Sequence, residues 1–157
     1  MFIYILRHAW ADHADDPNWP SDTQRPLTEE GRERFARVMP RLVKRGFAPE
    51  VIATSPYLRC RQTAQAIAEH VEGDPDIVEL SALAPQSDLA AIMGWTREQD
   101  VEQMAWVGHS PDIGFLAATL LGNCSAIERF APGTCAAVHI DQEAAQGAGQ
   151  LQWLVAG

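Results

Sequence analysis

The chain has 157 residues, of which 46% are hydrophobic and 21% charged, a composition typical of globular rather than disordered proteins. Its formal net charge of −9 argues against a nucleic-acid partner, because the phosphates of DNA and RNA are bound by basic surfaces. No apolar run approaches the length of a membrane span, so no membrane partner is expected. We expect residues 1–157 to form a single domain with a sizeable core.

The N-terminus and the cysteines favour a cytoplasmic location. The first apolar run is short and is followed directly by Arg7 and His8, which does not fit a signal peptide. Cys60, Cys124 and Cys135 are odd in number and far apart in the sequence. This spacing predicts reduced thiols rather than a disulfide framework.

The first half of the chain predicts two strand–helix pairs. Residues 2–6 form a short apolar run that is typical of a strand buried on both faces. After an irregular loop, residues 27–46 show helical periodicity, with Thr28 as the expected N-cap. A second strand at residues 50–54 leads into a helix, which the Ser55-Pro56 dipeptide is expected to cap and begin.

The second half continues the alternation of strands and helices. Residues 76–80 and 103–108 predict two more strands, with a short helix near residues 87–95 between them. A second Ser-Pro dipeptide, at residues 110–111, is expected to begin the next helix. Residues 134–157 predict two strands in a hairpin. The alternation implies an α/β fold, with a mainly parallel sheet and helices on both faces.

Basic residues follow three of the predicted strands. Arg7 and His8 come directly after the first strand, Arg59 lies in the first turns of the helix after the second, and His109 follows residues 103–108. Because the carboxyl ends of parallel strands lie on one edge of the sheet, these side chains are expected to converge. The helix N-termini at the two Ser-Pro dipeptides would add backbone N–H groups there. We therefore predict an anion-binding site that contains two histidines.

Four segments, in the same order, resemble the motifs of the histidine phosphatase (phosphoglycerate-mutase-like) superfamily: LRHAWA (6–11), RPLTEEG (25–31), TSPYLRCRQTA (54–64) and WVGHSP (106–111). The short chain and the alanine after His8 make it most similar to the small phosphohistidine phosphatases of the SixA type. The resemblance implies a phosphoglycerate-mutase-like three-layer sandwich. It also implies that His8 is a nucleophile that becomes phosphorylated, that Arg7 and Arg59 clamp the phosphoryl oxygens, and that His109 completes the site.

The remaining expectations concern Arg25 and metals. Arg25 precedes the PLT segment and is expected to reach the phosphate from the loop. No metal or cofactor is expected, because the arginines and a protonated His109 can neutralise the phosphoryl charge. The alternative is a metal site made of His8, His109 and Asp12. Against it, the adjacent Arg7 would repel a divalent cation, and the spacing resembles no zinc site.

The general acid of the superfamily is missing from its expected position. Many members carry a carboxylate after the third strand, where this chain has Pro85, with Glu79 and Asp88 nearby but off the pattern. The leading interpretation is a metal-independent phosphatase that acts on phosphohistidine of a protein partner, such as a phosphotransfer domain. Two alternatives stay open: a phosphomonoesterase for a small phosphorylated metabolite, and an inactive phosphate-binding regulatory module.

Overall fold

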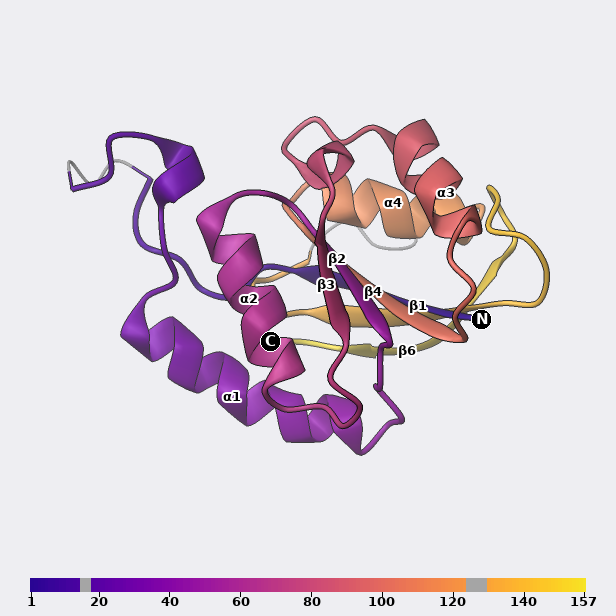
Figure 1. Cartoon of the computed structure of the whole chain (residues 1–157), viewed down its shortest axis with the longest axis horizontal. Coiled ribbons are helices and arrows are strands. Elements are labelled where there is room, and N and C mark those ends of the chain that lie inside the picture. Colours follow the sequence, from indigo (N-terminus) through magenta and orange to yellow (C-terminus); the bar gives the residue numbers. More distant parts are fainter. Residues whose placement is uncertain (15–17, 124–129) are drawn as a thin grey trace.

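A six-stranded sheet lies between two layers of helices in the computed structural model, which describes residues 1–14, 18–123 and 130–157 (Figure 1). The strand order is β3-β2-β4-β1-β5-β6. The strands are β1 (Phe2–Arg7), β2 (Val51–Thr54), β3 (Asp76–Glu79), β4 (Gln103–Gly108), β5 (Cys135–Ile140) and β6 (Gly149–Val155). Strands β1 to β4 pair in parallel, whereas β5 runs antiparallel to both β1 and β6. The predicted mainly parallel sheet and C-terminal hairpin are therefore confirmed.

The helices divide between the two faces of this sheet. On one face lie α1 (Glu29–Val43) and α2 (Leu58–Ala68), and on the other lie α3 (Leu89–Arg97) and α4 (Asp112–Leu120) (Figure 1). Two short 3₁₀ turns, η1 (Asp22–Gln24) and η2 (Ser81–Leu83), lie in the connecting loops. The predicted α/β fold with helices on both faces is confirmed.

The central strands are apolar throughout because each face packs against helices. In β1, Ile3 and Ile5 belong to the core under α3 and α4, whereas Tyr4 and Leu6 belong to the core under α1 and α2. Successive side chains of a strand point to opposite faces, so a strand covered on both sides reads as an unbroken apolar run. This explains why the run ends where β1 leaves the sheet, at Arg7.

The helix starts are predicted only in part. Thr28 caps α1 as expected, because its hydroxyl accepts a hydrogen bond from the Gly31 N–H at 2.9 Å. The expected Ser-Pro starts are confirmed only at the second dipeptide: α4 begins at Asp112 with Pro111 as its N-cap, whereas α2 begins at Leu58 with Tyr57 as its N-cap. At the first of them, the Ser55 N–H donates to Val107 O at 3.0 Å, so the chain continues the pairing of β2 beyond the strand end before it turns.

The remaining expectations concern the state of the cysteines and the presence of a membrane span. Cys60 and Cys135 are buried free thiols, as expected, and Cys124 lies outside the described residues. In the described ranges, no helix combines the length and the apolar character that crossing a membrane requires.

Candidate active site

The carboxyl ends of three neighbouring strands carry the candidate residues. His8 follows β1, Ser55 follows β2 and His109 follows β4. The His8 N–H donates to Gly108 O at 3.0 Å, which ties the end of β1 to the end of β4. The convergence expected at this edge of a parallel sheet is present, and the two imidazole centroids lie 5.4 Å apart.

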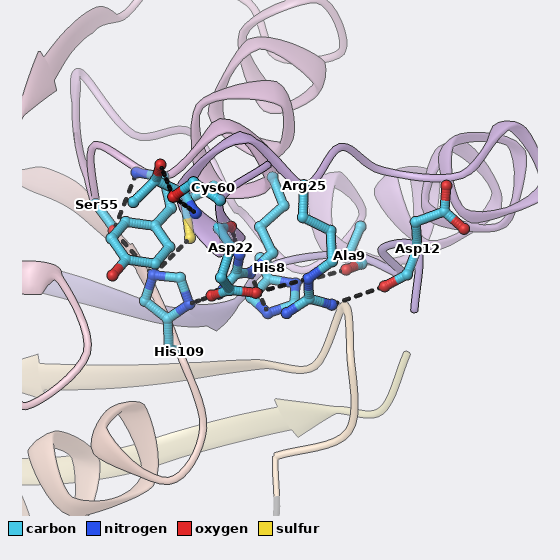
Figure 2. A network of polar contacts seen from close by, with 12 residues as sticks. His8, Ala9, Asp12, Asp22, Arg25, Ser55, Cys60 and His109 are labelled. Carbon is cyan, nitrogen blue, oxygen red and sulfur yellow. Dashed lines mark hydrogen bonds and ion pairs between the residues drawn. The ribbon is translucent and has the colours of Figure 1, made fainter. Parts of the chain in front are cut away.

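His8 presents an unprotonated nitrogen to the site. Its side chain is buried, at 6% exposure, and Nδ1 lies 2.7 Å from the Ala9 carbonyl oxygen (Figure 2). A carbonyl can only accept, so Nδ1 carries the proton and Nε2 keeps its lone pair. Arg59 Nε donates to that Nε2 at 3.3 Å. Burial lowers the pKa of His8 to about 3, and the charges of Arg59 and Arg7 act in the same direction, so the ring is neutral.

Arg59 lies at the centre of the site, with 3% of the residue exposed. Besides its bond to His8, NH1 donates to the main-chain oxygen of Asp22 at 2.8 Å, and NH2 donates to the Asp22 carboxylate at 3.0 Å. NH2 also lies 3.1 Å from Nδ1 of His109. The guanidinium stands over the ring of Tyr57, 4.9 Å from its centroid. All three guanidinium nitrogens of Arg59 are therefore engaged.

His109 is neutral in this arrangement. Its Nε2 lies 2.8 Å from the Ser55 hydroxyl and 3.4 Å from Sγ of Cys60 (Figure 2). Because Arg59 can only donate, Nδ1 of His109 accepts and Nε2 carries the proton. Burial lowers the pKa of His109 to about 4, and the charge of Arg59 adds to this, although Asp22 opposes it. The expected protonated form of His109 is therefore wrong at neutral pH in this arrangement.

Two further arginines face the same region. Arg7 donates from NH1 to Phe130 O at 2.7 Å, and its buried Nε has no hydrogen-bond partner among the described residues. Burial lowers the pKa of Arg7, as do the charges of Arg59 and Arg25. Arg25 donates from NH1 to the main-chain oxygen of Asp12 at 2.7 Å. The structure thus brings together all five residues predicted for the site, and among the described residues the buried Nε of Arg7 has no hydrogen-bond partner.

Asp22 is a site residue that the sequence analysis missed. It is the first residue of η1, and its carboxylate accepts from Arg25 Nε at 2.8 Å and from Arg59 at 3.0 Å. Burial alone would raise the pKa of Asp22, but the hydrogen bonds and charges of Arg25 and Arg59 outweigh it, so the pKa is lowered. The only sequence signal was its position three residues before Arg25 in a turn-rich loop.

The two carboxylates near Pro85 in the sequence, Glu79 and Asp88, bind partners outside the site. Glu79 accepts from Arg61 NH1 at 3.2 Å on an exposed surface. Asp88 caps α3, because its carboxylate accepts from the Ala91 N–H at 3.0 Å. Neither takes the place of the acid expected at Pro85.

The alternative metal site is not formed. Within residues 1–14, 18–123 and 130–157, no three His, Cys, Asp or Glu side chains lie where they could hold a metal ion together. Asp12 instead meets the site through its main-chain oxygen, on Arg25. His8, His109 and Asp12 are therefore not a set of metal ligands.

Comparison with known proteins places this geometry in a family. The model of the histidine phosphatase superfamily (branch 1) matches residues 3–87, more than half of the chain and the part that holds Arg7, His8, Arg25 and Arg59. The chain belongs to the histidine phosphatase superfamily. The resemblance drawn from the four sequence motifs is therefore confirmed, and the chain is a phosphatase of this superfamily.

Individual relatives give more detail. An uncharacterized protein of Picosynechococcus sp. is 38% identical over 117 residues, which cover 73% of this chain and 69% of that protein. Phosphohistidine phosphatase SixA of Escherichia coli is 27% identical over 158 residues, which cover 98% of this chain and 92% of that protein.

Solved structures agree with the fold. The structure of the protein histidine phosphatase SixA complexed with tungstate matches with a TM-score of 0.84 and 25% identity, over 99% of this chain and 97% of that chain. A phosphoglycerate mutase of Plasmodium falciparum matches with a TM-score of 0.68 and 15% identity, over 97% of this chain and 88% of that chain. The phosphoglycerate-mutase-like fold is therefore confirmed.

Proposed function

We propose that this phosphatase removes the phosphoryl group from phosphohistidine on a protein partner, with His8 as the nucleophile. The observation that carries the proposal is the tautomer of His8, which keeps the Nε2 lone pair directed at the guanidinium of Arg59. A buried neutral imidazole held in this way is a competent nucleophile for phosphorus. The relatives named SixA support the phosphohistidine substrate.

Three arginines bind the phosphoryl oxygens in this proposal. Arg59 and Arg25 converge on one carboxylate, which has the same need for paired N–H donors as a phosphoryl group. Arg7 contributes a buried Nε that has no partner among the described residues. Phosphoryl transfer depends on positioning and on stabilising negative charge on the equatorial oxygens, and guanidinium groups supply both.

The reaction proceeds by two displacements. In the first, a bond forms between His8 Nε2 and phosphorus while the P–N bond to the substrate imidazole breaks, and the leaving ring takes a proton from solvent. Nδ1 of His8 keeps its proton, so the phosphorylated ring is formally cationic and its N–H stays on the Ala9 carbonyl. In the second, water attacks phosphorus, the bond to Nε2 breaks, and the water proton passes to solvent. The products are inorganic phosphate and neutral His8.

A covalent phosphohistidine is expected when the enzyme is mixed with a radiolabelled phosphotransfer domain that carries phosphohistidine. Rapid acid-free quenching and separation by size should show label on this chain. The bond should survive alkali and break in acid, because it is a phosphoramidate. Label should be lost in His8→Ala, since that variant has no nucleophile at this position.

Two results would contradict this assignment. An adduct that survives acid and is cleaved by alkali would be an ester and would point to Ser55 or Ser110. Efficient labelling from an alkyl phosphate, with none from the phosphohistidine donor, would be compatible with a covalent intermediate on this chain. It would contradict phosphohistidine as the substrate.

Activity is expected to persist in excess EDTA. The arginines of the site supply the positive charge that a divalent cation would otherwise provide, and the described residues offer no set of metal ligands. The measurement is the initial rate before and after dialysis against chelator. Loss of activity that zinc, magnesium or manganese restores would overturn the metal-independent mechanism.

A further inference from the structure

The Asp22 carboxylate occupies N–H groups that the proposed mechanism assigns to the phosphoryl group. One carboxylate oxygen accepts from Arg25 Nε at 2.8 Å and the other from Arg59 NH2 at 3.0 Å, so a single anion bridges the two guanidinium groups (Figure 2). The other two guanidinium nitrogens of Arg59 also have partners, because Nε donates to His8 and NH1 donates to the main-chain oxygen of Asp22. A phosphoryl group that binds the same two N–H groups, on Arg25 Nε and Arg59 NH2, must therefore displace this carboxylate.

The surroundings of Asp22 permit such a movement. Its side chain is 47% exposed, whereas that of Arg59 is 4% exposed and fixed by several contacts. The backbone of Asp22 stays attached independently, because its main-chain oxygen accepts from Arg59 NH1 at 2.8 Å. Rotation of the carboxylate into solvent would free one donor on each arginine without unfolding η1.

We propose that Asp22 is a tethered competitor of the phosphoryl group. Its carboxylate holds Arg25 and Arg59 directed at one point, and a phosphoryl group displaces it from both. Inorganic phosphate makes no contacts outside the phosphoryl site that could offset the free-energy cost of displacing Asp22. The product therefore binds weakly and leaves readily. A protein substrate offsets the displacement with contacts outside the phosphoryl site. This inference rests on the proposed function, because it assigns Arg25 and Arg59 to phosphoryl binding.

The test is the affinity for inorganic phosphate of the whole protein, measured by calorimetry in wild type and in Asp22→Asn. The variant keeps the size of the side chain and one acceptor oxygen, and it removes the negative charge. Because the Asp22 carboxylate is half exposed, solvent screens its two ion pairs, and their release is expected to tighten phosphate binding about 5-fold. The KM for a phosphohistidine protein should fall as well, without a rise in kcat. Asp22→Ala, as a second variant, should also bind phosphate more tightly than wild type.

Asp12→Asn is the matched control. It removes the same charge from the same loop, but Asp12 contacts Arg25 through its main-chain oxygen, so the guanidinium groups keep their partners (Figure 2). Its phosphate affinity should stay within about 2-fold of wild type. Equal tightening in this control would show a general charge effect and overturn the role of Asp22.

The remaining outcomes separate this inference from the proposed function. Unchanged or weaker phosphate binding in both Asp22 variants would overturn the competitor role and make Asp22 a positioning residue for the arginines. If wild type binds no phosphate and His8→Ala leaves turnover intact, the proposed function fails instead. The unfolding midpoint of Asp22→Asn should lie within about 4 °C of wild type, because solvent screens the half-exposed Asp22 carboxylate and its ion pairs then contribute little to stability.

Discussion

His8→Ala is expected to reduce kcat/KM for a phosphohistidine-bearing protein by at least about 10³-fold while the fold stays intact. The substitution removes the Nε2 lone pair that faces Arg59. The neighbouring His109 does not replace it, because its Nδ1 accepts from Arg59 and its protonated Nε2 is directed at Ser55. The hydrogen bonds of the His8 side chain go to Ala9 and Arg59, so its loss leaves the sheet and both cores in place. Phosphate release gives the rate, and circular dichroism with a melting curve reports the fold.

His70→Ala is the matched control for this prediction. His70 is exposed just beyond the end of α2, where its Nδ1 contacts the Ala66 carbonyl, away from the site. Its removal should leave kcat/KM within about 2-fold of wild type, as for most surface substitutions. Activity of His8→Ala within tenfold of wild type would exclude His8 as the nucleophile.

The parts of the site that could be predicted from sequence are those fixed by strand ends. Each parallel strand is a short apolar run, and the polar residue that follows it must lie at one edge of the sheet. That rule alone brings Arg7, His8 and His109 together. Arg59 follows from the same rule one step later, because α2 begins at that edge and Arg59 is its second residue.

Asp22 could not be predicted because its position depends on a loop. The segment before Arg25 is polar and rich in turn formers, and such composition predicts irregular structure but not its path. Only the fold reveals that η1 lies against Arg59, 37 residues further along the chain. The same loop supplies Asp12, whose main-chain oxygen, rather than its carboxylate, contacts Arg25.

The protonation states of the two histidines also could not be predicted from the sequence. A histidine in an arginine-rich phosphate site could be a cation that binds the anion or a neutral base. The choice depends on burial and on the partner of each ring nitrogen. For His109, burial and the guanidinium of Arg59, which donates to Nδ1, favour the neutral ring. The Ser55 hydroxyl accepts from the protonated Nε2. Ser55, expected to cap a helix, instead orients this histidine.

Phosphohistidine is expected to be hydrolysed with a kcat/KM about 10²–10⁴ times that of simple alkyl phosphates, because Glu79, Asp88 and Asp22 are not free to act as a general acid for the leaving group. An alkyl ester expels a strongly basic alkoxide, which needs a proton in the transition state. The carboxylates near the place where the superfamily carries its acid are otherwise engaged, Glu79 with Arg61 and Asp88 with the start of α3. Asp22 is held ionised by two arginines, so it has no proton to donate.

A leaving imidazole has less need of a general acid, since its ring nitrogen is far less basic than an alkoxide and solvent can protonate it. Aryl phosphates expel a leaving group of intermediate basicity and should fall between the two classes. The ordering is measured as kcat/KM for a phosphohistidine peptide or phosphotransfer domain, an aryl phosphate and an alkyl phosphate under one set of conditions. The aryl ester is the informative control, because it shares the P–O bond of the alkyl ester and differs chiefly in leaving-group basicity. Equal or faster turnover of the alkyl phosphate would mean that a proton donor does act in this site, and the chain would then be a phosphomonoesterase for a small phosphorylated metabolite.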